Sequence, residues 1–537
     1  MSSIGLAGDT LDTAYVVLLV LLVIYIPIYI WVWRCPEAAE RFHLSRYGPA
    51  LMVKTRLGFR TMDRLARYTR FWAVFGFVSK IISAVLLFLM MYMMVVAIMA
   101  IPSRIGSSAI GIEYALAIPG FNPIMPLSYG VVALVVAMVV HELGHGIQTR
   151  ANGARVDSSG LLYGVIPLGA FVEPNEEDMA ARSRRVRMDM YTAGISVNTF
   201  VAIGSIAVLI LACGAVTSDH SDDVGVYAID NGSPAYIAGI PASAIVTGVQ
   251  EYGSKTFTEV DSVQGGGVVS IDYDFDPSMY YILQYETEVG THTTTEPVQM
   301  GAFIKSVTNG SPADRGDVGV GQFIYSLTSD GVVTQIHSTY DFMSYMAATE
   351  PGQVLTLTTV TVAEHGGSPE FVTHEGIVLA DRSSQGFLGL SVTTGGMTLT
   401  TPGILLDKAR DPFYGATDPF SYVSALFSYL SGPFNGMDPI SDEVRWWYDA
   451  PGDDIFWIAI TMLYWIFWLD ILLAISNALP AYPFDGGFIF AGGVNWLLER
   501  FGVSDTERRD RISDSVSNSV STVVLFMFMM VILSFII

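Results

Sequence analysis

Long apolar runs divide this chain and set the strongest limit on how it can fold. Each run is at least as long as the ~20 apolar residues that a helix needs to cross a bilayer. The runs are residues 14–33, 71–101, 127–148, 188–216, 455–481 and 516–537. Hydrophobic residues make up 51% of the chain, which is typical of a membrane protein with a substantial soluble part. We therefore predict a polytopic α-helical membrane protein with about six transmembrane helices.

Arginine-rich segments lie between these runs and predict their orientation. The segments are residues 34–70, 150–187 and 483–514. Positively charged loops stay on the cytoplasmic side, so both termini and residues 217–454 are expected outside the cytoplasm. The polar residues before the first run lack a basic stretch, which favours an uncleaved anchor in the cell membrane over a removed signal peptide.

The charge balance and the cysteines narrow the possible partners and sites. The formal net charge of −23 argues against nucleic acid as a partner. The two cysteines, Cys35 and Cys213, lack the spacing of metal ligands or of a disulfide framework. A metal site in this chain must therefore use histidine, aspartate or glutamate.

The long segment 217–454 is predicted to be a mostly β insertion, because short β-branched stretches alternate with turn residues. Residues 225–248 and 301–326 echo each other. Each has a strand, the sequence Asn-Gly-Ser-Pro-Ala, a short helix and a second strand. This arrangement resembles PDZ modules and implies two PDZ-like units, residues 217–298 and 299–400. A single β-domain with a duplicated hairpin is the alternative.

Residues 401–454 form the predicted linker between the insertion and the fifth run. Within it, residues 419–434 are aromatic and apolar but too short to cross a bilayer. The helix that they predict could lie along the membrane surface, or it could pack on the β-domain.

The third run ends in the sequence His141-Glu142-Leu143-Gly144-His145. Two histidines four residues apart lie on one face of a helix and can reach one metal ion. Residues 129–140 before them carry no charge, so the metal site is expected at the end of a membrane-buried helix. The glutamate between the histidines can act as a general base toward a metal-bound water.

A catalytic zinc site usually has three protein ligands, so a third ligand is expected at a similar membrane depth. Asp485 follows the fifth run in the sequence Asn477-Ala-Leu-Pro-Ala-Tyr-Pro-Phe-Asp485-Gly-Gly. An unpaired carboxylate at that depth would be costly, and coordination to a dication explains its presence. The nearby prolines and glycines would break the helix and aim the carboxylate inward.

Two further features lie at membrane depth. Asp470 lies inside the fifth run, and intramembrane carboxylates are candidates for functional sites. Helix pairing or contact with water is the alternative interpretation of Asp470.

Residues 160–172 are apolar but too short and too rich in glycine and proline for a span. A re-entrant hairpin or a strand pair fits better, because irregular backbone is tolerated at this depth where it is buried in protein or lines a wet cavity.

Together these motifs resemble the site-2 protease family of intramembrane zinc metalloproteases. The resemblance rests on His-Glu-x-x-His in an apolar helix, Asn-x-x-Pro followed by Asp-Gly, and the PDZ-like insertion. It covers the third, fourth and fifth runs well, and the first two and the last run barely. One departure is Phe484, where the family usually has leucine before Asp-Gly. Both residues are apolar and the ligand is unchanged.

The resemblance implies a role for each residue of the main motifs. His141, His145 and Asp485 are expected to bind Zn²⁺. Glu142 is expected to polarise the attacking water, and Asn477 to position the substrate or stabilise the oxyanion.

The resemblance also implies a site for the substrate. The stretch that contains Gly164, Pro167 and Gly169 resembles a re-entrant β element of the family, which is expected to pair with the substrate backbone by β-augmentation. Asn198 lies in a small-residue segment that resembles the middle core helix of the family.

The expected activity is hydrolysis of peptide bonds in transmembrane protein substrates near the cytoplasmic side, within the lipid bilayer. The PDZ-like units are expected to filter substrates outside the cytoplasm. The alternatives are a metal transporter and a non-catalytic membrane sensor with a vestigial zinc site. A transporter predicts a polar path across the membrane, whereas the outer halves of these runs are apolar. A vestigial site would not need Glu142 as a base.

These expectations divide the chain into six parts. They are the first two helices with a basic cytoplasmic loop (1–125), the catalytic core helices (126–216), the two PDZ-like units (217–298 and 299–400), the linker (401–454) and the last two helices with the Asp-Gly motif (455–537).

Overall fold

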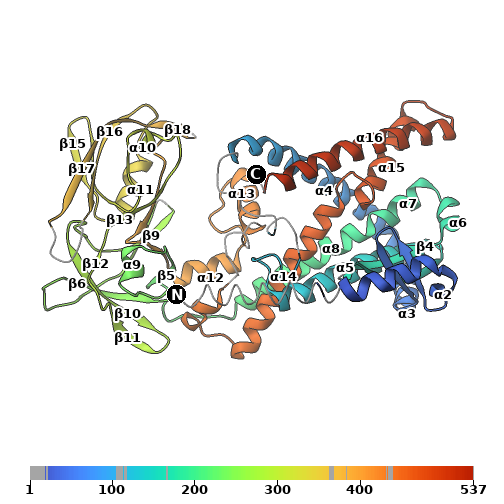
Figure 1. The fold of residues 1–537 in the computed structure, drawn as a ribbon, viewed down its shortest axis with the longest axis horizontal. Helices are drawn as coiled ribbons and strands as arrows, with labels where there is room; N and C mark the ends of the chain where they lie inside the picture. The colour runs from blue at the N-terminus through green and yellow to red at the C-terminus, as the bar shows by residue number, and fades with distance from the viewer. Residues whose placement is uncertain are drawn as a thin grey trace. The chain divides into compact units, whose positions relative to one another are not determined.

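The computed structural model describes residues 19, 22–104, 113, 118–164, 167–265, 267–361, 368–382, 384–430, 432 and 440–535. The chain divides into two compact units (Figure 1). The first, called here the membrane unit, comprises residues 1–209 and 458–537. The second, called the insertion unit, comprises residues 210–457.

Five helices among the described residues are long and apolar enough to cross a membrane. These helices are α4 (Thr69–Arg104), α5 (Leu127–Ala151), α7 with α8 (Arg184–Tyr191 and Ala193–Cys213), α14 (Asp453–Asn477) and α16 (Thr506–Leu533) (Figure 1). The chain is therefore a multi-pass membrane protein with a β insertion, as predicted.

The first and last predicted spans differ from the rest. The first, residues 14–33, lies partly outside the described residues, and its described part belongs to a shorter apolar helix, Leu22–Arg34. The last was predicted to begin at residue 516, but α16 begins at Thr506. Asp505 caps this helix by accepting the backbone N–H of Arg508, and polar residues then continue it before the apolar run starts.

A four-stranded antiparallel sheet lies in the membrane unit, in the order β1-β2-β3-β4. Its strands are β1 (Leu44–Tyr47), β2 (Ala50–Thr55), β3 (Val156–Tyr163) and β4 (Pro167–Pro174). Strands β3 and β4 form the strand pair that was predicted around residues 160–172. Strands β1 and β2 come from the arginine-rich segment 34–70, where no strand was predicted. Within the described residues, β4 is one of the two edge strands of this sheet, and β1 is the other.

Glu173 joins three strands of this sheet. Its carboxylate accepts hydrogen bonds from Ser158 Oγ on β3 (2.5 Å) and from Lys54 Nζ on β2 (2.9 Å). The hydrogen bond from Ser158, and then the Lys54 ammonium, lower the pKa of Glu173 below its ordinary value. Because this pKa is depressed in the folded protein, ionised Glu173 stabilises the sheet above the unfolded pKa, and the stabilisation is lost as pH falls through the folded-state pKa.

We expect Glu173→Gln to lower the unfolding temperature at neutral pH and to change it little at pH values below the folded-state pKa. The loss at neutral pH should be under about 1 kcal/mol, because Lys54 and Glu173 are both partly exposed. Thermal unfolding of the wild type and the variant at both pH values measures this effect. An equal shift at the two pH values would contradict a role for the ionised carboxylate.

One antiparallel sheet dominates the insertion unit, with a main strand order of β11-β10-β6-β5-β21-β20-β13-β14-β16-β17. The strands are β5 (Val224–Ile229), β6 (Ile245–Glu251), β10 (Tyr280–Thr287), β11 (Gly290–Thr293), β13 (Ala302–Val307), β14 (Phe323–Ser329), β16 (Val354–Thr361), β17 (Glu370–Val378), β20 (Leu390–Thr394) and β21 (Met397–Thr400). Two separate hydrophobic cores pack on it, one around Phe275 and the other around Phe342. Met397 and Leu399 of β21 belong to the first core, although they follow the second core in the chain.

The repeated Asn-Gly-Ser-Pro-Ala sequence folds in the same way twice. Ser233 and Ser311 each cap the short helix that follows by accepting a backbone N–H. Each serine also lies against a glycine of positive φ, Gly396 (93°) for the first and Gly389 (91°) for the second. A Cβ at either glycine would overlap the serine side chain, so both turns require glycine.

The helix predicted in the linker is α13 (Pro419–Leu430), and none of its residues is buried. Its exposed side chains include Phe420, Val423 and Leu426, and it carries no charge. The preceding helix, α12 (Pro402–Arg410), is fixed to the end of α8, because Arg410 donates hydrogen bonds to the carbonyl oxygens of Cys213 and Val216. A position of α13 on the membrane surface remains a prediction.

Candidate metal centre

The histidine pair lies on α5, where the helix has carried no charge for more than three turns. His141 and His145 are one turn apart, and their Nε2 atoms are separated by 3.2 Å. Their ring planes are nearly perpendicular, at 77°. The proximity of the two rings follows from the spacing of four residues on a helix.

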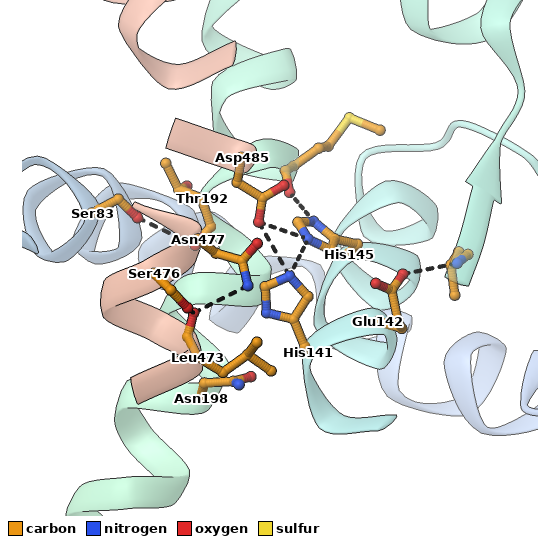
Figure 2. Close-up of polar contacts among 12 residues, drawn as sticks. Ser83, His141, Glu142, His145, Thr192, Asn198, Leu473, Ser476, Asn477 and Asp485 are labelled. Carbon is orange, nitrogen blue, oxygen red and sulfur yellow. Dashed lines mark hydrogen bonds and ion pairs between the residues drawn. The ribbon is translucent and has the colours of Figure 1, made fainter. Parts of the chain in front are cut away.

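Asp485 is the first residue of α15 (Asp485–Arg500). Although it is far from the histidine pair in the sequence, it lies beside the pair in the structure. Its Oδ2 atom lies 3.2 Å from His141 Nε2 and 3.1 Å from His145 Nε2. Figure 2 shows the three side chains pointing toward one another. One ligand atom from each residue lies within 4.8 Å of the others.

The turn before α15 aims this carboxylate. Gly486 packs on the backbone of Ala478 at the end of the fifth span, so closely that a Cβ would overlap the Ala478 carbonyl. The backbone N–H of Tyr482 donates to Ser521 Oγ of α16 (3.2 Å). The last helix thereby fixes the loop that carries Asp485, and glycine is required where this loop folds back.

The donor set fits a zinc ion. Two imidazole nitrogens and one carboxylate oxygen converge at a buried point, and three ligands of this kind hold catalytic zinc with a position left open. His145 Nδ1 lies 2.8 Å from the backbone oxygen of Met190. That hydrogen bond places the proton on Nδ1 and leaves Nε2 free to bind a metal, which is the usual outer-shell arrangement of zinc-binding histidines.

A close approach of two helices shapes one wall of the centre. A Cβ at Gly144 of α5 would lie 2.9 Å from Val197 of α8. A Cβ at Gly194 of α8 would lie 2.7 Å from both Cε1 and Nε2 of His141 and would also overlap His145 Nε2. The glycines in the His-Glu-x-x-His motif and in the small-residue segment therefore let α8 pack directly on the imidazoles.

Glu142 lies next to the histidines but contacts the small sheet. Its Oε2 atom accepts the backbone N–H of Val172 on β4 (2.8 Å), as Figure 2 shows. Val172 belongs to the edge strand of the sheet, so this N–H points to the open edge. The general-base candidate and the free edge of β4 are therefore side by side.

Comparison with known proteins places this arrangement in a family. Residues 129–532 match the sequence model of peptidase family M50, the family of the site-2 proteases. The chain belongs to peptidase family M50. The family predicted from the sequence motifs is thereby confirmed. The matched range runs from the helix that carries the histidine pair to the last spanning helix and includes the insertion.

A curated relative of this M50 chain is known only as "Uncharacterized protein MJ0971" of Methanocaldococcus jannaschii. The two are 32% identical over 202 residues, which is 37% of this chain and 52% of the relative. The chain thus matches about half the length of that relative.

The structure places the two predicted asparagines of the M50 core close to His141 (Figure 2). Asn477, the last residue of α14, donates from Nδ2 to the carbonyl oxygen of Leu473 (3.0 Å). Asn198 is fully buried in α8 and donates from Nδ2 to the carbonyl oxygen of Ala137 (3.3 Å). Both side chains therefore help to hold helix backbone at the site.

The three remaining predicted residues lie on or beside the small sheet. Gly164 follows β3, Pro167 begins β4, and Gly169 lies within β4. A Cβ at Gly169 would lie 3.8 Å from Met138 of α5, so the strand runs close to the helix of the histidine pair. Contact of these three residues with a substrate remains a prediction.

Sequence reasoning missed a partly buried ion pair behind the centre. Lys80 of α4 donates to Asp189 of α7, and their side chains are 25% and 13% exposed. Asp189 precedes Met190, whose carbonyl oxygen holds His145. The signal in the sequence was Lys80 itself, a lysine within a long apolar run, but nothing in the sequence indicates its partner.

We expect Lys80→Met to lower the free energy of unfolding by about 3 kcal/mol, because it leaves Asp189 charged and unpaired in a largely buried position. Thermal unfolding of the purified protein in detergent measures this loss. The double variant Lys80→Met, Asp189→Leu should recover part of the stability, since it removes both charges. A double variant no more stable than Lys80→Met would contradict the pairing.

Proposed function

We propose that this chain is an intramembrane zinc metalloendopeptidase that hydrolyses peptide bonds of transmembrane proteins. The observation that carries the proposal is the convergence of His141, His145 and Asp485, with Glu142 beside them at the edge of a β-strand. Membership of peptidase family M50 supports the same chemistry.

The residues of the chain suggest how the reaction would proceed. His141, His145 and Asp485 would hold zinc, which when bound supplies Lewis-acid activation of water and of the scissile carbonyl. Glu142 would take the proton of the attacking water and return it to the leaving amine. Asn477 lies close enough to His141 to place an amide donor near the developing oxyanion.

The edge of β4 supports a mode of substrate binding. Alternate residues of a strand direct their backbone groups to the same side, so the N–H of Val172 and the backbone groups of Ala170 face the open edge together. An unwound substrate segment could pair there by β-augmentation. Val172 N–H would then exchange Glu142 for a substrate carbonyl, which would free the carboxylate as pairing occurs.

The orientation and the role of the insertion also belong to this proposal. The histidine motif and Asp485 both adjoin arginine-rich segments, which supports cleavage near the cytoplasmic ends of the spans, with both termini and the insertion outside. The two hydrophobic cores and the repeated serine-capped turns are compatible with two PDZ-like units. We propose that these units filter substrates by the size of their ectodomain.

Metal removal tests the proposed function. We expect purified protein reconstituted in liposomes to cleave a single-span test substrate, to lose this activity on dialysis against a chelator, and to regain it when Zn²⁺ is added. Zinc content is measured on the same samples, and Mg²⁺ is the control addition because histidine nitrogens do not suit it. Cleavage that persists in zinc-free protein would contradict a metallopeptidase.

A further inference from the structure

Asp470 is a fully buried carboxylate in the membrane unit that the proposed reaction does not use. It lies in α14, and its exposed fraction is 0%. Among the described residues, neither of its carboxylate oxygens has a hydrogen-bond partner. A buried carboxyl group with no partner costs several kcal/mol, so a position of this kind calls for an explanation.

Asp470 lies on the side of α14 that faces the metal centre. Seven residues separate it from Asn477, and seven residues at 100° each bring the side chain back to within about 20° of the same direction. Asn477 points toward His141 in Figure 2. At a rise of about 1.5 Å per residue, Asp470 is therefore about 10 Å from Asn477 along this face, on the side away from the arginine-rich segments.

Among the described residues, two other buried polar atoms at or near the metal ligands have no hydrogen-bond partner. They are Nδ1 of His141 and Oδ1 of Asn198. Asn198 is one helical turn from Gly194, where α8 packs on the His141 imidazole. Its Nδ2 donates to the carbonyl oxygen of Ala137, one turn before His141 on α5, so Asn198 lies toward the depth of Asp470. Polar groups that do not touch one another can be bridged by ordered water.

Small buried side chains lie near this series. Ala137 of α5 and Ala202 of α8 are fully buried, and they lie one helical turn from His141 and from Asn198, respectively. Buried polar groups in such a setting hold ordered water when two to four partners are in reach. The donor of His141 Nδ1 and the acceptors of Asn198 and Asp470 provide these partners.

We propose that Asp470 is a positioning residue of the metal centre, joined through internal water and Asn198 to the Nδ1–H of His141. The inference rests on the proposed zinc site. A zinc-binding histidine almost always donates its second ring N–H to a carboxylate, a carbonyl or water. His145 does so to the Met190 carbonyl oxygen on α7, whereas His141 does so through water to a carboxylate on α14. The two ligands are therefore oriented by different helices.

Zinc affinity of the full-length protein in detergent tests this role without any substrate. We expect Asp470→Leu to weaken Zn²⁺ binding about 10- to 100-fold, the usual cost of losing an outer-shell partner, and Asp470→Asn, which keeps an acceptor, to weaken it less. Thr461→Val is the matched control, because Thr461 is a buried polar residue of α14 on the opposite face. Its affinity should equal that of the wild type.

A second measurement separates positioning from a purely structural role. The infrared difference spectrum between zinc-loaded and zinc-free protein should contain a carboxyl band that Asp470→Asn removes and Thr461→Val keeps. Wild-type zinc affinity in Asp470→Leu, or identical difference spectra in wild type and Asp470→Asn, would overturn the inference and leave the zinc site standing. A wild-type protein that binds no zinc would overturn the metal site and this inference together.

Discussion

Replacing Glu142 with glutamine is expected to slow cleavage of a transmembrane test substrate by about 10²- to 10⁴-fold, the usual contribution of a general base. Glutamine has the same shape but cannot accept the proton of the attacking water. Its amide oxygen can still accept the N–H of Val172, so the contact between α5 and β4 should remain. Zinc should stay bound, because Glu142 is not among the three converging ligand atoms.

The measurement pairs a cleavage assay with zinc content for the wild type, Glu142→Gln and Glu177→Gln. Glu177 is an exposed carboxylate of α6 (Glu176–Ala180), and its substitution should leave both quantities unchanged. Glu142→Gln protein that cleaves at the wild-type rate would exclude Glu142 as the base. Loss of zinc in this variant would show that the glutamate holds the metal centre together in a way the geometry does not indicate.

The metal centre could be predicted from the sequence because its main parts are locally encoded. The spacing of His141 and His145 fixes their common helix face, and an aspartate flanked by turn residues after an apolar run has few roles other than ligation. The groups that hold these ligands in place could not be predicted from the sequence. The Met190 carbonyl has no side-chain signature, and the pairing of Lys80 with Asp189 joins segments that only the folded bundle brings together.

The two sheets likewise contain pairings that the local sequence does not indicate. The strand pair of β3 and β4 follows from an apolar stretch broken by glycine and proline, but β1 and β2 lie among arginines that indicate only a cytoplasmic loop. In the insertion, the repeated sequence predicts two similar turns. It does not predict that β21 belongs to the first core. There Met397 of β21 pairs with Ile229 of β5, and the sequence does not indicate which of several similar strands β21 pairs with.

The second large effect is expected at Gly194, where α8 packs on the metal ligands. A Cβ at this position overlaps both imidazoles. Gly194→Ala should therefore displace His141 or His145 by a fraction of an ångström to one ångström. Misplacement on this scale costs on the order of 10²-fold in rate, and we expect a loss of that size in cleavage, together with weaker zinc binding.

Gly204→Ala provides the matched control on the same helix. A Cβ at Gly204 meets nothing within 4 Å, and alanine is the better helix former by about 1 kcal/mol, so this variant should be active and at least as stable as the wild type. The two variants make the same chemical change in one helix and differ only in what the new methyl group meets. If Gly194→Ala kept wild-type cleavage and zinc affinity, α8 could not pack on the imidazoles as described, and the metal centre would have to be wider than the structure indicates. If both variants lost activity equally, the loss would come from stiffening of α8 and not from the contact with the histidines.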